Sequence, residues 1–155
     1  MTLTTPAPEA PEAPATAREL PEWNEPAGST ARGTVIVLAG RGEAGGVYER
    51  FGRRLSADAY RVRVVRDISH DPRGSASIVR GLVAEAEVQP VVLVGSDAGS
   101  ILALDLATEP RSGVSAVVSA GLPSAHGLLA DEQAQLDARS ACPVHRQVQI
   151  GRAHV

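Results

Sequence analysis

A short glycine-flanked segment near the middle of the chain carries the residue with the clearest chemical potential. The apolar run at 91–94 is followed by GSDAG at 95–99, with Gly95 and Gly99 on either side of Asp97 and its neighbours. A reactive side chain on a tight strand-to-helix turn needs small flanking residues, because the backbone is cramped on both sides. The pattern therefore predicts that Asp97 is presented at a sharp turn, where its ionised carboxylate could act as a nucleophile.

A second glycine-rich segment follows the first apolar run of the chain. Gly40, Gly42 and Gly45 have the Gly-x-Gly-x-x-Gly spacing of dinucleotide-binding domains, in which backbone N–H groups approach a pyrophosphate. Asp67 ends the next apolar run about 20 residues further on, where such domains place a ribose-binding acid. A Rossmann-type dinucleotide-binding domain is therefore one interpretation, although it gives no role to the segment 95–99.

Other reactive side chains are sparse. Cys142 and His145 are two potential metal ligands three residues apart, but the chain offers no second pair, so we expect no metal site and no cofactor. Cys142 is also the only cysteine, which excludes an internal disulfide and favours a cytoplasmic setting.

The residues around these motifs alternate between strand-like and helical patterns. Apolar runs rich in β-branched residues lie at 34–40, 60–67, 91–95 and 114–120, as is typical of strands buried on both faces. Segments with helical spacing separate them at 47–58, 75–86 and 98–108. Such alternation implies right-handed crossovers, so the predicted fold class is a three-layer α/β/α domain with a mostly parallel sheet.

The helical segments carry specific predictions. In the first, Tyr48, Phe51 and Leu55 share one face and are expected to pack on the sheet. Ser75 is predicted to cap the second helix, and Pro110 to end the third. The apolar stripe predicted for the second helix consists of Ile78, Val79, Leu82, Val83 and Ala86.

Both ends of the chain differ from this body. Residues 1–32 are rich in Pro, Ala and Glu and are expected to form a disordered, solvated tail. Residues 150–155, with the sequence IGRAHV, look like one reading frame of a sequencing adapter and are expected to be non-native. The expected domain therefore covers residues 33–149.

The composition limits the partners. All basic residues are arginines, they are scattered, and the net charge is -3, so no nucleic-acid partner is expected. No apolar run approaches the roughly 20 residues of a membrane span, and no signal peptide is visible. We expect a soluble cytoplasmic protein that acts on a small-molecule substrate.

The segment that begins at Gly40 resembles the monoacylglycerol-lipase and lysophospholipase-like branch of the α/β hydrolases. That branch has His-Gly-x-Gly-Glu, then a tyrosine and a Leu-x-x-x-Gly-Tyr-x-Val stretch. The positions that match are Arg41, Gly42, Glu43, Tyr48, Leu55, Tyr60 and Val62. The resemblance covers about residues 33–123 and implies a truncated hydrolase of small ester, acyl or alkyl-type substrates. It also implies a nucleophile elbow at Asp97 and an oxyanion hole built from the backbone N–H groups of Arg41 and Ala98.

The chain departs from this family at its most reactive positions. Ala39 replaces the usual histidine, the segment after Asp67 is shortened and altered, and Asp97 stands where the branch has serine. The acid and histidine of the triad are absent, and the histidines after the turn are not placed to act as the catalytic base. These are His126, His145 and His154. We therefore expect the chain alone to lack hydrolytic turnover.

Three interpretations of Asp97 remain open. It could be a nucleophile toward an sp³ carbon, as in haloalkane dehalogenases and epoxide hydrolases, although those usually have Trp where this chain has Ala98. It could be the relic of an inactivated serine hydrolase, which would leave a non-enzymatic hydrolase-like binding protein. It could also be an ordinary helix N-cap.

Overall fold

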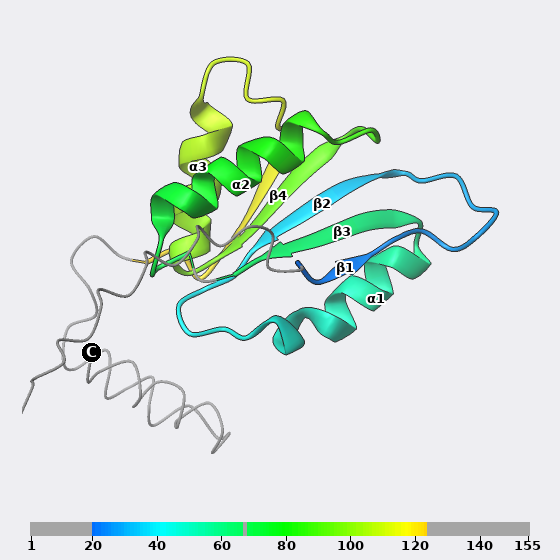
Figure 1. The fold of residues 1–155 in the computed structure, drawn as a ribbon, viewed down its shortest axis with the longest axis horizontal. Coiled ribbons are helices and arrows are strands. Elements are labelled where there is room, and N and C mark those ends of the chain that lie inside the picture. Colours follow the sequence, from blue (N-terminus) through cyan, green and yellow to red (C-terminus); the bar gives the residue numbers. More distant parts are fainter. Residues whose placement is uncertain (1–19, 67, 124–155) are drawn as a thin grey trace, which may run out of the picture. The chain divides into compact units, whose positions relative to one another are not determined.

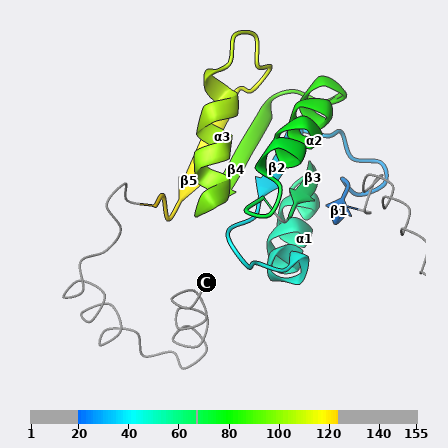
Figure 2. The ribbon, with the colours of Figure 1, turned by 60° about the vertical axis from the view of Figure 1, so that its left-hand side comes forward.

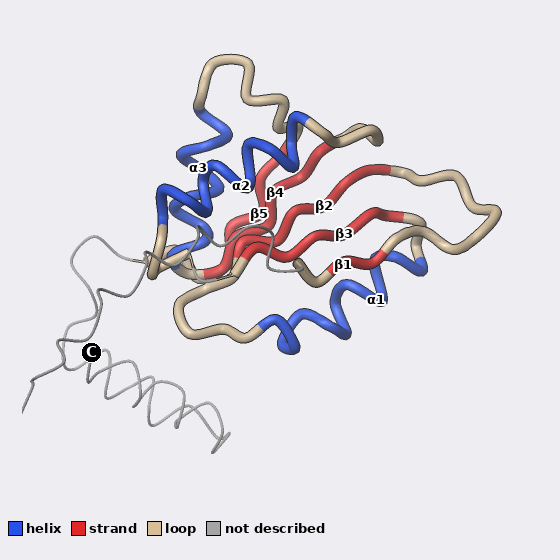
Figure 3. Tube along the Cα trace, viewed as in Figure 1, coloured by secondary structure: helices blue, strands red, loops and turns tan. Residues whose placement is uncertain are grey.

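A computed structural model describes residues 20–66 and 68–123, and their folded core is a five-stranded sheet within one compact unit that ends at Gly121. The strand order is β1-β3-β2-β4-β5, and every pair is parallel except β1 with β3 (Figure 1). The strands are β1 (Glu22–Trp23), β2 (Gly33–Leu38), β3 (Tyr60–Val65), β4 (Val91–Ser96) and β5 (Ala116–Ala120). Figure 3 shows these strands side by side in red, with helices on either side.

Helices cover both faces of the sheet, as the alternating pattern predicts. They are the 3-10 helix η1 (Gly45–Tyr48) and the α-helices α1 (Glu49–Ala57), α2 (Pro72–Ala84) and α3 (Ala98–Thr108). α1 lies on one face, whereas α2 and α3 lie on the other (Figure 2). The predicted three-layer α/β class is therefore confirmed. Pro110 follows the end of α3, with Glu109 already in an extended conformation, as expected for a residue before proline.

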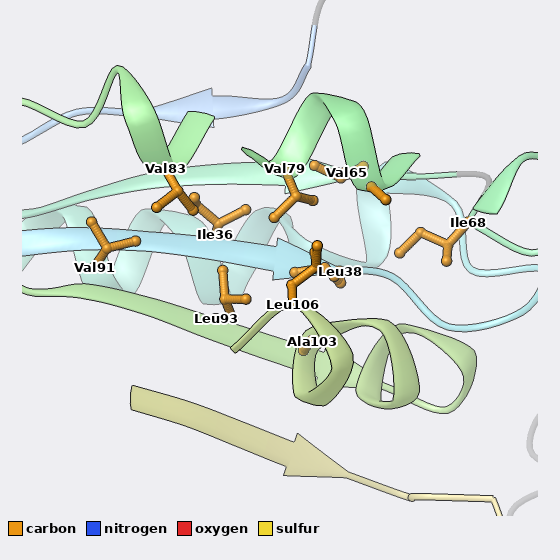
Figure 4. Close-up of a cluster of buried hydrophobic side chains, with 11 residues drawn as sticks. Ile36, Leu38, Val65, Ile68, Val79, Val83, Val91, Leu93, Ala103 and Leu106 are labelled. Atoms are coloured by element: carbon orange, nitrogen blue, oxygen red, sulfur yellow. The ribbon is translucent and has the colours of Figure 1, made fainter. Parts of the chain in front are cut away.

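The alternation of side chains along β2 feeds two separate cores. Ile36 and Leu38 belong to the cluster under α2 and α3 (Figure 4), and Val35 and Val37 belong to the cluster under α1. All six residues of β2 are buried. Since burial of one such aliphatic side chain stabilises a fold by about 1.5–3 kcal/mol, β2 anchors both layers.

The sheet extends further toward the N-terminus than residue 33. Residues 22 and 23 lie within the segment that the sequence assigns to a solvated tail, yet β1 pairs with β3 in antiparallel register. Trp23 packs against the cluster under α1. The ring of Trp23 gives this segment an apolar surface that packs on the core, although the segment is otherwise rich in Pro, Ala and Glu.

The face that α1 turns toward the sheet differs from the predicted one. Tyr48 and Leu55 pack on the core, but Phe51 is 40% exposed, and Gly52 is the buried residue of the helix. The ring of Trp23 occupies the space beside Gly52, so a Cβ atom there would overlap it. The helix therefore contacts Trp23 through Gly52, which has no side chain, and not through an apolar side chain.

The second helix begins earlier than predicted. Asp71 is its N-cap and accepts a hydrogen bond from the Gly74 N–H at 2.8 Å, and Pro72 occupies the first turn. Ser75, predicted as the cap, is buried inside the helix. Of the predicted stripe, Val79 and Val83 are buried, whereas Ile78 is 43% exposed because it lies about 100° around the helix from Val79.

We expect Gly52→Ala to destabilise the fold by about 1–3 kcal/mol, because the added methyl group overlaps the Trp23 ring. Gly81→Ala is the matched control, since Gly81 lies in α2 and a Cβ atom there meets nothing within 4 Å. The control should be neutral or stabilise by up to about 1 kcal/mol. Urea unfolding followed by fluorescence of Trp23, the only tryptophan, measures both. Equal midpoints for the two variants would contradict the assigned contact.

Candidate functional site

The two glycine-containing motifs meet at one position in the sheet. The chain runs from β2 to β3 on one side and then crosses back to β4 on the other side of β2. Ligands of open α/β sheets bind at the carboxyl ends of the strands, where such connections leave in opposite directions. The loop after β2 and the turn after β4, residues 95–99, both lie at this switch point. We refer to residues 95–99 as the Asp97 turn.

The Asp97 turn reverses the chain in a conformation that few side chains adopt. Asp97 has φ 49° and ψ −116°, and it lies between the end of β4 and the first residue of α3, Ala98. Its N–H donates to the Ala120 carbonyl at 3.1 Å, at the end of β5. A non-glycine residue held in such a region costs on the order of 1–3 kcal/mol, so the surrounding structure must enforce it.

Close backbone packing explains the glycines of the Asp97 turn. A Cβ atom at Gly95 would lie 2.5 Å from the carbonyl oxygen of Gly99, and one at Gly99 would overlap the carbonyl group of Leu38. Ser100 is fully buried, and its Oγ lies 2.7 Å from the Gly95 carbonyl and 3.0 Å from that of Ala120. The start of α3 is therefore pressed against the ends of β2 and β4.

The Asp97 carboxylate faces the loop that follows β2. The backbone N–H of Arg41 lies 3.4 Å from Asp97 Oδ2, and the Nε atom of Arg41 lies 3.5 Å from the same oxygen. The side chain of Asp97 is 18% exposed, whereas that of Arg41 is 60% exposed. Although Asp97 holds the N-cap position of α3, its side chain makes no capping hydrogen bond, which contradicts the N-cap interpretation.

A second carboxylate, that of Glu43, lies behind the loop; the sequence marks Glu43 as a family match but gives it no role. Glu43 Oε2 accepts a hydrogen bond from the Gly40 N–H at 2.6 Å and another from the Tyr48 hydroxyl, and Ser96 Oγ lies 3.2 Å from Oε1. The Glu43 N–H in turn donates to the Gly40 carbonyl at 3.2 Å. This reciprocal pattern resembles a capping box, so the three-residue spacing of Gly40 and Glu43 was the available signal.

The surroundings of Tyr48 keep its hydroxyl protonated. Partial burial, and after it the hydrogen bond to the Glu43 carboxylate, together raise the pKa of Tyr48 to about 12. The phenol therefore remains a donor to the Glu43 carboxylate at neutral pH. Tyr48 contributes both to the apolar cluster under α1 and to this polar contact.

The glycine-rich loop does not have the arrangement of a dinucleotide site. The Gly40 N–H is taken by Glu43, and a carboxylate there would repel a pyrophosphate. Gly42 has φ 70°, and Gly45 opens a 3-10 turn, so that α1 begins only at Glu49. The third parallel strand lies beside the first, whereas a Rossmann domain places it beside the second. Asp67, the predicted ribose-binding acid, lies outside the described residues.

The structure adds no metal site or membrane segment in the part that it describes. Within residues 20–66 and 68–123, no group of three or more His, Cys, Asp or Glu side chains is arranged to hold a metal ion. In the same ranges, no helix combines the length and apolar character needed to cross a bilayer. Cys142 and His145 lie outside the described residues.

Comparison with known proteins places the fold. No family model matches the chain, and no curated protein matches it in sequence. Similar solved structures include a thioesterase domain from the curacin biosynthetic pathway, at 22% identity and a TM-score of 0.56, and Thermogutta terrifontis esterase 2 phosphonylated by sarin, at 17% identity and a TM-score of 0.51. The fold is a partial α/β-hydrolase fold.

The likeness to these α/β hydrolases covers most of this chain but only part of theirs. The matches cover 80% and 79% of this chain, and 50% and 58% of the thioesterase domain and the esterase. The chain thus spans about half the length of each neighbour. The comparisons confirm the fold that the two motifs predict, and they do not single out the monoacylglycerol-lipase-like branch.

We expect Tyr48 to ionise near pH 12. Tyr48 and Tyr60 are the only tyrosines, so ultraviolet titration of Tyr60→Phe isolates Tyr48. Because the folded pKa is raised above 10, the stability that neutral Tyr48 contributes is present below pH 10 and is lost as the pH rises toward 12. Glu43→Gln should lower the midpoint, since it removes an anionic acceptor. A midpoint near 10 in the folded Tyr60→Phe protein would contradict the contact with Glu43.

Proposed function

We propose that this chain is part of an α/β-hydrolase enzyme in which Asp97 holds the nucleophile position. The observation that carries the proposal is the strained Asp97 turn, with φ 49° and with Oδ2 3.4 Å from the Arg41 N–H. The N–H groups of Arg41 and Ala98 are proposed to form the oxyanion hole, since Ala98 follows the turn directly. Gly95 and Gly99 serve this site by allowing the close packing that holds the turn.

The chemistry of a carboxylate favours an alkyl-type substrate for this site. Attack by Asp97 on an ester carbonyl would give an anhydride, whereas attack on an sp³ carbon forms a stable alkyl ester. With an epoxide, the new carbon–oxygen bond forms as the ring carbon–oxygen bond breaks, and the ring oxygen leaves as an alkoxide that takes a proton from water. Oδ2 then becomes the ester carbonyl oxygen, next to the Arg41 N–H that would stabilise charge on it during hydrolysis.

The whole protein requires more than the described residues supply. Hydrolysis of the alkyl ester needs a base-activated water, and we propose that an acid and a histidine outside the described residues provide it. We propose that this domain reaches from β1 to residue 149 and that residues 150–155 lie outside it. Within the fold, the segment Arg41-Gly42-Glu43 with Tyr48 supports the monoacylglycerol-lipase-like branch. The single cysteine supports a cytoplasmic setting, and the negative net charge supports an enzyme for small molecules rather than a nucleic-acid binder.

Covalent labelling tests the nucleophile. We expect the full 155-residue chain, incubated with excess styrene oxide, to gain one equivalent of the reagent, with the adduct mapped by peptide mass spectrometry to Asp97. The half-reaction needs no histidine, because the carboxylate is already ionised at neutral pH. The label should persist, because we expect this chain to lack the acid and histidine that would activate water to hydrolyse it.

Two matched variants interpret the labelling. Asp97→Asn should lose the adduct, and Asp105→Asn, which changes an exposed aspartate of α3, should keep it. Labelling that is absent at Asp97, or unchanged in Asp97→Asn, would remove the alkyl-nucleophile assignment and leave the relic or binding-protein interpretations. Turnover of p-nitrophenyl esters by the chain, abolished in Asp97→Ala, would instead show a complete ester hydrolase.

A further inference from the structure

We propose that Glu43 is a positioning residue whose carboxylate orients the Arg41 N–H toward Asp97. The proposal rests on the proposed function of the Asp97 turn, since it assigns Glu43 a role in building the same site. Glu43 is three residues from Gly40 in sequence but contacts three segments: the start of the loop after β2, the 3-10 helix η1 and the end of β4.

The first step of the argument concerns two consecutive peptide groups. The Gly40 N–H points at Glu43 Oε2, at 2.6 Å, and the next N–H along the chain, that of Arg41, points at Asp97 Oδ2, at 3.4 Å. Peptide groups are planar, so only the two backbone dihedrals of Gly40 separate these N–H directions. Fixing the first peptide plane on Glu43 therefore restricts the direction in which the second N–H can point.

The second step concerns what holds Glu43 itself. Ser96 Oγ lies 3.2 Å from Glu43 Oε1, and the Tyr48 hydroxyl donates to Oε2. Ser96 directly precedes Asp97, so the carboxylate connects the loop to the strand end from which the Asp97 turn departs. Glu43 therefore fixes the orientation of the Arg41 N–H relative to Asp97, the residue that this N–H faces.

The third step concerns the space at Gly40. A Cβ atom there would lie 2.9 Å from Glu43 Oε2 and 3.1 Å from Ser96 Oγ, closer than side chains normally approach. Gly40 has no positive φ, so its need for glycine comes from this approach and not from its backbone conformation. The loop is shaped to receive a carboxylate against its backbone.

The fourth step concerns charge. The three donors around Glu43 are a backbone N–H, a phenol and an alcohol, and an ionised carboxylate has acceptor sites for all of them. Glutamine has the same shape but no charge. With its oxygen in the place of Oε2 and its amide group facing Ser96 Oγ, it would hold the Gly40 N–H and the Tyr48 hydroxyl by weaker hydrogen bonds than the carboxylate does. Glu43→Gln therefore tests the positioning while changing the volume little.

The test follows the Arg41 amide by NMR in the ¹⁵N-labelled full chain. The Arg41 amide proton should shift when Asp97→Asn removes the carboxylate that it faces. In Glu43→Gln we expect Asp97→Asn to shift the Arg41 amide less, while the remaining amide spectrum shows a folded protein. Glu85→Gln, at the exposed end of α2, is the matched control and should leave the effect of Asp97→Asn unchanged.

Each outcome decides a different point. If Asp97→Asn shifts the Arg41 amide as much in folded Glu43→Gln as in the unsubstituted chain, the positioning role is overturned while the Asp97 site stands. If Asp97→Asn alone leaves the chemical shift of the Arg41 amide unchanged, the proposed site itself is wrong, and so is the role of Glu43. Should Glu43→Gln not fold, Tyr48→Phe and Ser96→Ala each remove one support of Glu43. A reduced Arg41 response in both supports the proposal, and an unchanged response in both overturns it.

Discussion

The approach of the first residues of α3 to the end of β2 determines the geometry of this molecule's candidate site. Gly99 lies so close to the Leu38 carbonyl that no side chain fits between them, and Gly95 also packs closely against the backbone of Gly99. Strand and helix can meet this closely only if the chain reverses within one residue. Asp97 is that residue, and the close contact forces its φ to 49°, which strains the backbone. The apolar cores on both sides of β2 supply the stability that keeps the strained turn in place.

The same contact gives the loop after β2 its function in this account. With the ends of β2 and β4 side by side, the loop faces the Asp97 turn, and two carboxylates approach it from different segments. Glu43 takes the Gly40 N–H, and Asp97 takes the Arg41 N–H. The donor expected to stabilise an oxyanion is therefore already paired with an oxygen of Asp97 itself. That pairing suits a nucleophile whose own oxygen carries the charge during hydrolysis of an alkyl ester.

The layers of the fold could be predicted from the sequence. Strands that are buried on two faces are rich in β-branched residues, and the helices between them place apolar residues with a 3.6-residue period. The sharp turn at Asp97 was also predictable, since only close backbone packing requires glycine on both sides of it. The face of α1 was not, because the ring of Trp23 packs on Gly52 and leaves Phe51 exposed. The contacts of Glu43 were missed for a related reason. One partner, Ser96, is 53 residues away from Glu43 in the sequence, and no local sequence pattern indicates such a distant contact.

The account depends most on the backbone strain at residue 97. Two substitutions test it, because the strain determines which of the two variants is the more stable. In the left-handed region glycine is favoured over alanine by roughly 1 kcal/mol or more, whereas at an ordinary φ alanine is favoured by about 0.5–1 kcal/mol. Both substitutions remove the carboxylate and its contact with Arg41, so their difference reports the backbone alone. The free energies of unfolding of Asp97→Gly and Asp97→Ala in urea should therefore show the glycine variant to be the more stable. A more stable alanine variant would contradict the turn on which the site depends.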